Sequence, residues 1–180
     1  MISEKVAEAY AEALFQLASE NDCLDETYCD LSSVSDIFDE NPGFIDLLSS
    51  PTLSKEEKLS VLNKTFKDDG SILFDFLCLL TERNRIRCIS QIKNDFRNFY
   101  NQKNGIEEVT VTSSIPLSED ERCRLIVKLQ NKLSKRIKLT EKVDKSLIGG
   151  VRLKYGDTLI DNSVASRIEN IAEKLTQPAK

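Results

Sequence analysis

Histidine is absent from this chain of 180 residues. Because histidine is the commonest acid–base group near neutral pH and the commonest ligand for metals, neither kind of site has its usual donor here. Paired carboxylates at 56–57, 68–69 and 107–108 fall in expected loops, first helical turns and a strand start, where surface charge is their usual role. We therefore expect no catalytic residue, no metal site and no enzymatic activity.

Cysteine pairs and long apolar runs are also missing. The five cysteines are odd in number and show no metal-ligand spacing, which favours free thiols in a reducing compartment. The most apolar run, residues 72–80, has about half of the roughly 20 residues that span a bilayer and contains Asp75. The first residues carry Glu4, Glu8 and Glu12, so we expect no signal peptide and no basic transit peptide. Any link to a membrane is expected to be indirect, through a partner.

Charge is divided unevenly along the chain. Residues 1–105 carry 19 acidic and 11 basic side chains, whereas residues 106–180 carry 11 acidic and 14 basic ones. The net charge is therefore −8 in the first part and +3 in the second. This asymmetry favours two domains with different partners, and an unevenly charged solvated surface is the alternative.

Apolar spacing predicts six helices in the first part. They cover residues 6–18, 24–38, 44–48, 54–66, 72–80 and 86–99. In the first and fifth of these helices, apolar side chains satisfy helical spacing on two faces at once, which is more apolar surface than one core contact hides. Gly105 is expected to close the last helix. The expected fold of residues 1–105 is an all-α six-helix bundle.

The period of the pattern changes after residue 105. Val109 and Val111 alternate with threonines, as in a half-buried strand, and residues 138–143 alternate again. A capping box from Ser118 to Glu121 predicts a helix between these strands. Its inward side chains are expected to be Leu125, Ile126, Leu129 and Leu133. Mixed strands and helices after an all-helical part predict a small α+β domain over residues 106–180.

Residues 143–175 hold the most distinctive pattern. Gly149 and Gly150 precede an alternating strand, Gly156 makes a turn, and Asp161 and Ser163 open an amphipathic helix. We expect a hairpin followed by a capped helix. The apolar face of that helix is expected to pack on the hairpin through Val164, Ile168, Ile171 and Leu175. The paired glycines lack the other residues of a phosphate loop, so we expect a close backbone approach or a bulge, and no nucleotide or other cofactor.

This order of elements resembles the C-terminal segment of the delta subunit of bacterial F-type ATP synthase, which is related to the mitochondrial oligomycin-sensitivity-conferring protein. Three further segments are similar to that family and follow in the same order. They are V-A-E-A-Y-A-E-A-L-F-Q-L-A from residue 6, T-E-R-N-R-I from residue 81, and V-T-V-T-S-S-I-P-L-S-E-D-E from residue 109. The resemblance therefore spans nearly the whole chain.

The resemblance implies a non-catalytic stator subunit of the peripheral stalk, present once per complex at the cytoplasmic face of the bacterial cell membrane. Such a subunit links the catalytic head to the b subunits, so that ion translocation is coupled to ATP synthesis. The second domain would bind the b subunits, and a groove between the first and fifth helices would hold the N-terminal helix of an alpha subunit. The expected groove residues are Val6, Tyr10, Ala13, Leu17, Ile72, Phe76 and Leu79. Their alternative role is ordinary bundle core.

Two features depart from the family pattern. Ala9 and Glu12 stand where basic residues are common on either side of the first-helix tyrosine, and Ala165 replaces a common arginine, although Arg167 is retained. Polar contacts at the rim of each binding site are expected to differ accordingly.

An RNA-binding function of the second domain is the alternative. A basic face on a small α/β domain suits RNA, and its residues would be Lys132, Lys135, Arg136, Lys138, Lys142 and Lys145. However, Tyr155 is the only aromatic residue after Tyr100, so the strands carry no platform on which bases stack. We therefore expect a protein partner and no nucleic acid.

Overall fold

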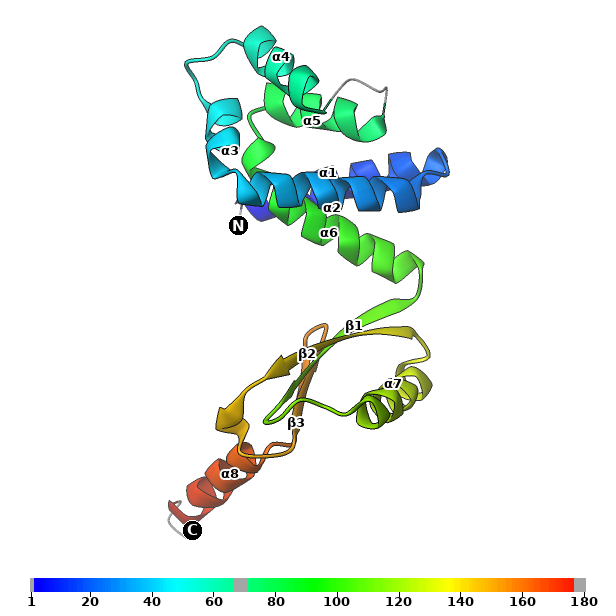
Figure 1. Ribbon diagram of the computed structural model, residues 1–180, viewed down its shortest axis with the longest axis vertical. Helices are drawn as coiled ribbons and strands as arrows, with labels where there is room; N and C mark the ends of the chain where they lie inside the picture. The colour runs from blue at the N-terminus through cyan, green and yellow to red at the C-terminus, as the bar shows by residue number, and fades with distance from the viewer. Residues whose placement is uncertain (1, 67–70, 177–180) are drawn as a thin grey trace. The chain divides into compact units, whose positions relative to one another are not determined.

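The computed structural model describes residues 2–66 and 71–176 of the chain, so the carboxylate pair at 68–69 lies outside the described residues. The chain divides into two compact units, Met1–Asn101 and Gln102–Lys180. In the described residues of the first unit the regular elements are helices joined by short turns, and the second unit combines helices with a four-stranded mixed sheet (Figure 1).

The helices of the first unit begin and end at recognisable signals. They are α1 (Ile2–Glu20), α2 (Leu24–Glu40), α3 (Pro42–Ser49), α4 (Lys55–Phe66), α5 (Ile72–Glu82), the short 3-10 helix η1 (Ile86–Cys88) and α6 (Ile89–Lys103). Pro42 opens α3, where its missing N–H costs no hydrogen bond. The backbone N–H of Ser54 donates to Glu57 Oε2 at 2.8 Å, and the N–H of Glu57 donates to Ser54 Oγ at 3.3 Å, which is the predicted capping box of α4.

The T-E-R-N-R-I segment closes α5. Asn84 has a φ of +52°, and the N–H of Arg85 donates to the carbonyl of Leu80 at 2.7 Å. A left-handed residue followed by such a bond is a common way to satisfy the last carbonyls of a helix. The Asn84 side chain also accepts a hydrogen bond at 3.2 Å from Nζ of Lys58, which is buried. The segment therefore ties the end of α5 to α4.

One hydrophobic core joins the helices of the first unit. Its fully buried side chains include Leu14, Leu31, Phe38, Leu62, Leu77, Leu80, Ile92 and Phe96. Each fully buried Leu, Ile or Phe stabilises the fold by about 1.5 to 3 kcal/mol relative to an exposed one. Aromatic rings are part of this core, with Phe15 edge-on to Phe96 at a centroid distance of 5.9 Å.

The second unit is a mixed sheet with two helices. Its elements are β1 (Ile106–Ser113), α7 (Glu119–Leu133), β2 (Arg136–Val143), the 3-10 turn η2 (Lys145–Leu147), β3 (Val151–Tyr155), β4 (Thr158–Asp161) and α8 (Val164–Thr176). The strand order is β2-β1-β3-β4. The β1–β2 pair is parallel and connected through α7, whereas β1–β3 and β3–β4 are antiparallel. The predicted hairpin followed by a capped helix is present as β3, β4 and α8.

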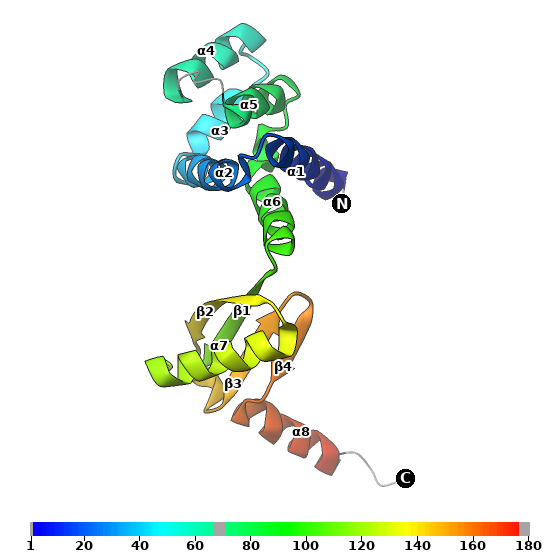
Figure 2. The same cartoon turned by 90° about the vertical axis from the view of Figure 1, so that its right-hand side faces the viewer.

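Helix α7 lies across one face of the sheet (Figure 2). Leu129 of α7 is buried, and so are Val109 and Val111 on the covered face of β1. The guanidinium of Arg122 lies 3.4 Å from a carboxylate oxygen of Glu141 on the same face. Of the four predicted inward side chains of α7, Leu129 is buried and Leu125, Ile126 and Leu133 are half-buried.

The prediction that the apolar face of α8 packs on the hairpin is wrong for the three side chains that the structure describes. Val164, Ile168 and Ile171 are 38%, 53% and 59% exposed. The side chain of Leu175 lies outside the described residues. The reason is that α8 is attached at its first turn, where the N–H of Val164 donates to the Gly149 carbonyl at 3.0 Å. Beyond that turn, Ile168 and Ile171 are exposed.

Candidate partner-binding surfaces

The two apolar faces of α1 separate in the structure. The face made of Ala7, Ala11, Leu14 and Ala18 is buried in the core. The other face carries the predicted groove residues: Ala13 is exposed, Leu17 is 45% exposed, and Val6 and Tyr10 are half-buried. Because three of the four core residues on this helix are alanines, the small side chains let neighbouring helices approach closely.

In helix α5 the two apolar faces separate less clearly into a buried and an exposed one. Leu73, Leu77 and Leu80, which form one of its two apolar faces, are buried in the core. Of the predicted groove residues, Leu79 is 41% exposed, Ile72 is half-buried, and Phe76 is only 7% exposed. Phe76 therefore contributes more to the core than to the surface.

The rings of Tyr10 and Phe76 join the two helices. Their centroids lie 6.2 Å apart with an interplanar angle of 70°, an edge-to-face contact of the kind that aromatic pairs prefer. This contact joins one predicted groove residue of α1 to one of α5, and Leu17 and Leu79 are exposed on the same two helices. We name the set Val6, Tyr10, Ala13, Leu17, Ile72, Phe76 and Leu79 the α1–α5 surface.

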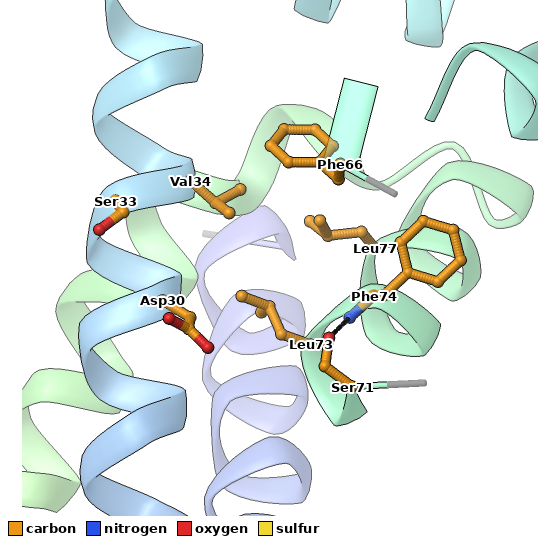
Figure 3. Close-up of a pocket in the computed structure, with 8 residues that line it drawn as sticks. All are labelled: Asp30, Ser33, Val34, Phe66, Ser71, Leu73, Phe74 and Leu77. Carbon is orange, nitrogen blue, oxygen red and sulfur yellow. Dashed lines mark hydrogen bonds between the residues drawn. The ribbon is translucent and has the colours of Figure 1, made fainter. Parts of the chain in front are cut away.

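A hollow of about 180 Å³ lies between α2, the end of α4 and the start of α5 (Figure 3). Val34, Phe66, Leu73, Phe74 and Leu77 form its apolar wall, and Asp30, Ser33 and Ser71 contribute polar groups. The Ser71 hydroxyl is already used, since it accepts a hydrogen bond from the N–H of Phe74 at 3.2 Å and caps α5. Among the described residues that line the hollow, Asp30 is the only one with an ionisable side chain.

The glycine pair of the second unit permits a close backbone approach, which is one of the two alternatives predicted from the sequence. Gly150 has a φ of +78°, and a β-carbon there would lie 2.4 Å from the backbone oxygen of Asn162. The glycines precede β3 and do not form a bulge within it. Gly156, with a φ of +50°, makes the turn between β3 and β4.

Asp161 and Ser163 open α8 as predicted. The N–H of Ser163 donates to Asp161 Oδ1 at 2.9 Å, and Arg152 Nε donates to Asp161 Oδ2 at 2.7 Å. Ser163 Oγ accepts from the N–H of Ser166 at 3.2 Å, which satisfies a free donor of the first turn. The hydroxyl and backbone N–H of Ser163, together with the Arg152 guanidinium, lower the pKa of Asp161 from 3.8 to about 2. The motif is therefore a structural joint.

A second exposed apolar surface includes Val164, Ile168 and Ile171 of α8, which the sequence interpretation assigned to the interior. It consists of Ile148, which is 66% exposed, with Val164, Ile168 and Ile171; we name it the α8 surface. Ile148 adopts a φ of +64°, and the neighbouring N–H of Gly149 donates to the Leu147 carbonyl at 2.7 Å. A β-branched residue rarely takes this conformation. The amphipathic pattern of α8 was visible in the sequence. Such a pattern does not distinguish an apolar face that is buried within the subunit from one that is covered by another protein.

Disulfides, metal sites and membrane-spanning helices are not found among the described residues. No disulfide joins any of the five cysteines, all of which lie in the described part of the chain. The described residues contain no group of three or more histidine, cysteine, aspartate or glutamate side chains that could hold a metal ion. In the same part of the chain, no helix is long and apolar enough to cross a membrane. Two exposed apolar surfaces on separate units indicate a protein that works by binding other proteins.

The comparisons with known proteins identify the family. The family model described as "ATP synthase delta (OSCP) subunit" matches residues 6–175. The sodium-ion-specific ATP synthase subunit delta of Ilyobacter tartaricus is 34% identical over 172 residues, which cover 96% of this chain and 99% of that one. The ATP synthase subunit delta of Geobacillus sp. (strain WCH70) is 37% identical over 176 residues, covering 97% and 99%.

A solved structure is also similar over nearly the full length. A chain of the mitochondrial ATP synthase hexamer of Toxoplasma gondii superimposes with a TM-score of 0.70 at 27% identity, covering 96% of this chain and 98% of that one. The chain therefore belongs to the ATP synthase delta (OSCP) subunit family, which confirms the resemblance noted in its sequence. It is a non-catalytic component of the peripheral stalk of an ATP synthase. The RNA-binding alternative finds no support in these comparisons.

Proposed function

We propose that this subunit, in one copy per complex, links the catalytic head of the ATP synthase to the b subunits and so couples ion translocation to ATP synthesis. In this proposal residues 1–105 act as a six-helix bundle that binds an alpha subunit, and residues 106–180 act as a small α+β domain that binds the b subunits. The complex sits at the cytoplasmic face of a bacterial cell membrane, and the subunit reaches the membrane only through its partners. The two exposed apolar surfaces, one on each unit, are the observation that supports a linking role.

The α1–α5 surface is the proposed site for the N-terminal helix of the alpha subunit. It presents apolar side chains from two helices joined by the Tyr10–Phe76 contact, which suits the apolar stripe of an amphipathic helix. Burial of about 600 Å² of apolar area would contribute on the order of 15 kcal/mol before the costs of association, which remove much of it. Leu17 and Leu79, being exposed in the free subunit, would gain most from being covered.

The Ala13→Asp variant tests this site. Ala13 is exposed in the free chain, so the variant should fold normally. A carboxylate pressed into an apolar contact loses its hydration without gaining a partner, so binding to a peptide with the sequence of the alpha N-terminus should be abolished. Isothermal titration calorimetry measures the binding, and circular dichroism checks the fold.

The matched control is Gln16→Asp, which adds the same charge to the same helix at an exposed position outside the α1–α5 surface. It should bind the peptide as the wild type does. Equal loss in both variants would mean that net charge, and not this surface, determines binding. If Ala13→Asp bound normally, the alpha site would lie elsewhere.

The α8 surface is the proposed site for the b subunits. Ile168→Asp should leave the second unit folded, because the side chain is 53% exposed, and should weaken binding to the b subunits. Asn170→Asp, an exposed position off this surface, is the control. Co-sedimentation with the soluble part of the b subunits measures both. Normal binding by Ile168→Asp would remove the α8 surface from this interface.

A further inference from the structure

The sheet of the second unit has two faces of different chemistry. In the register of the strands, Val109 lies beside Leu139 and Tyr155, and Val111 lies beside Glu141 and Leu153. These residues share the face that α7 covers. The residues that alternate with them point to the opposite face. Among the described residues of the second unit, none covers β2 on that side, where its alternate side chains are exposed.

The uncovered face is basic. Its charged residues are Arg136, Lys138 and Lys142 of β2, Glu108 of β1, Arg152 and Lys154 of β3, and Asp161 of β4. Lys138 lies 3.3 Å from Glu108, and Arg152 lies 2.7 Å from Asp161, so both acids are paired. No described carboxylate forms an ion pair with Arg136, Lys142 or Lys154. Arg136, Lys142 and Lys154 are exposed, so this face carries three cations with no ion-pair partner among the described residues.

The middle of this face is formed by small polar side chains. Thr110 lies between Thr140 and Lys154, and Thr112 lies between Lys142 and Arg152. Threonines present a low surface over which the longer lysine and arginine side chains can reach a bound segment. The face also includes a parallel strand pair, and parallel strands are usually covered on both sides.

We propose that this open face, defined by Arg136, Lys142 and Lys154, is an electrostatic docking surface for an acidic helix of the b subunit. The inference rests on the proposed function and names a second contact, apart from the α8 surface, within the same interaction. A helix of opposite charge lying on the open face would complete a layer that matches α7 on the other side. Because these charged side chains are exposed, they mainly affect which partner binds and how fast it associates. Both effects weaken as the salt concentration rises.

The experiment measures the affinity of the full chain for the soluble part of the b subunit with two charge-reversal variants. Lys142→Glu combined with Lys154→Glu reverses the open face, and Lys128→Glu combined with Lys132→Glu makes the same change in net charge on exposed positions of α7. We expect the first variant to bind at least about tenfold more weakly at low salt, and the second to bind within about twofold of the wild type. In about 0.5 M salt the difference should shrink, because surface charges are screened.

The outcomes separate this inference from the proposed function. If the wild type fails to bind the b subunit, both are overturned. If the wild type binds and the two variants are equal to each other, only the open-face contact is overturned. A single-stranded RNA probe that binds the wild type and is lost on reversal of the open face, with b binding unchanged, would also overturn it. Should the reversal variant not fold, Lys142→Gln with Lys154→Gln removes the charges alone and should give a smaller loss in the same direction.

Discussion

The backbone oxygen of Asn162 lies against Gly150, at 2.4 Å from the point where a β-carbon would be. Gly150 begins the approach to β3, and Asn162 leads from β4 into α8. The N–H of Asn162 also donates to the Val151 carbonyl at 3.1 Å. The hairpin and the start of α8 are therefore fixed to each other through backbone contacts that only glycine permits.

Gly150→Ala should destabilise the second unit by about 2 to 4 kcal/mol, because the new methyl group meets backbone and the left-handed φ of +78° is unfavourable for alanine. Gly43→Ala is the control, since a β-carbon there meets nothing within 4 Å. It should change the stability by less than about 1 kcal/mol. Urea denaturation followed by circular dichroism measures both. A loss below about 1 kcal/mol for Gly150→Ala would show that the joint relaxes easily.

Asp161 should make the stability of the second unit depend on acid pH. Its pKa is lowered from 3.8 to about 2 in the folded chain, so the folded state favours the carboxylate. The contribution is fully present above about pH 4 and is lost as the pH falls toward 2. Asp161→Asn should be less stable at neutral pH and should lose the wild type's extra pH dependence in this window. Thermal melts from pH 5 to about pH 2 test this. Parallel profiles for the two proteins would refute it.

Tyr100 should make the first unit sensitive to alkaline pH. Its hydroxyl donates to Asp25 at 2.7 Å, and this hydrogen bond, with burial, raises the pKa of Tyr100 from 10.0 to about 12. The folded state therefore retains the proton longer than the unfolded state, and stability should fall as the pH rises from 10 toward 12. Tyr100→Phe keeps the stacking on Tyr28, at 4.4 Å between centroids, and removes the titration. Denaturation midpoints compared at pH 8 and about pH 11 should differ less in the variant.

The two faces of α1 give a direct test of the α1–α5 surface. Ala11 is fully buried, so Ala11→Asp places a charge without a partner in the core. The variant should lower the free energy of unfolding of the first unit by about 3 kcal/mol or more, which is enough to unfold it. Ala13→Asp, two residues later on the exposed side, should leave the melting temperature nearly unchanged. If both variants unfolded, Ala13 would belong to the core after all.

Much of this architecture was predictable because local signals agree with the fold. The capping boxes at Ser54 and Ser118 each place a serine hydroxyl and a glutamate within three residues, so they mark helix starts without help from tertiary structure. The double apolar spacing of α1 predicted two apolar faces, and the structure buries one of them, formed by Ala7, Ala11, Leu14 and Ala18. Phe76 shows the limit, because helical spacing places it on the same stripe as Leu79 although the packing of α1 buries it. The exposure of α8 was not predictable, since an amphipathic pattern reports that a face is apolar and not which molecule covers it.

Removal of residues 164–180 should separate the two proposed binding functions. Because Ile168 and Ile171 are exposed, the sheet loses few contacts and should remain folded, with Val109 and Val111 still covered by α7. The first unit has its own core, so binding to the alpha peptide should persist while binding to the b subunits falls. In the assembled enzyme, ATP hydrolysis by the catalytic head should continue without coupled ion movement. The test measures binding of the truncated chain to the alpha peptide and to the b subunits. Equal loss of both would mean that the two partners do not bind separate units. Undiminished binding to the b subunits would place that contact on the sheet alone.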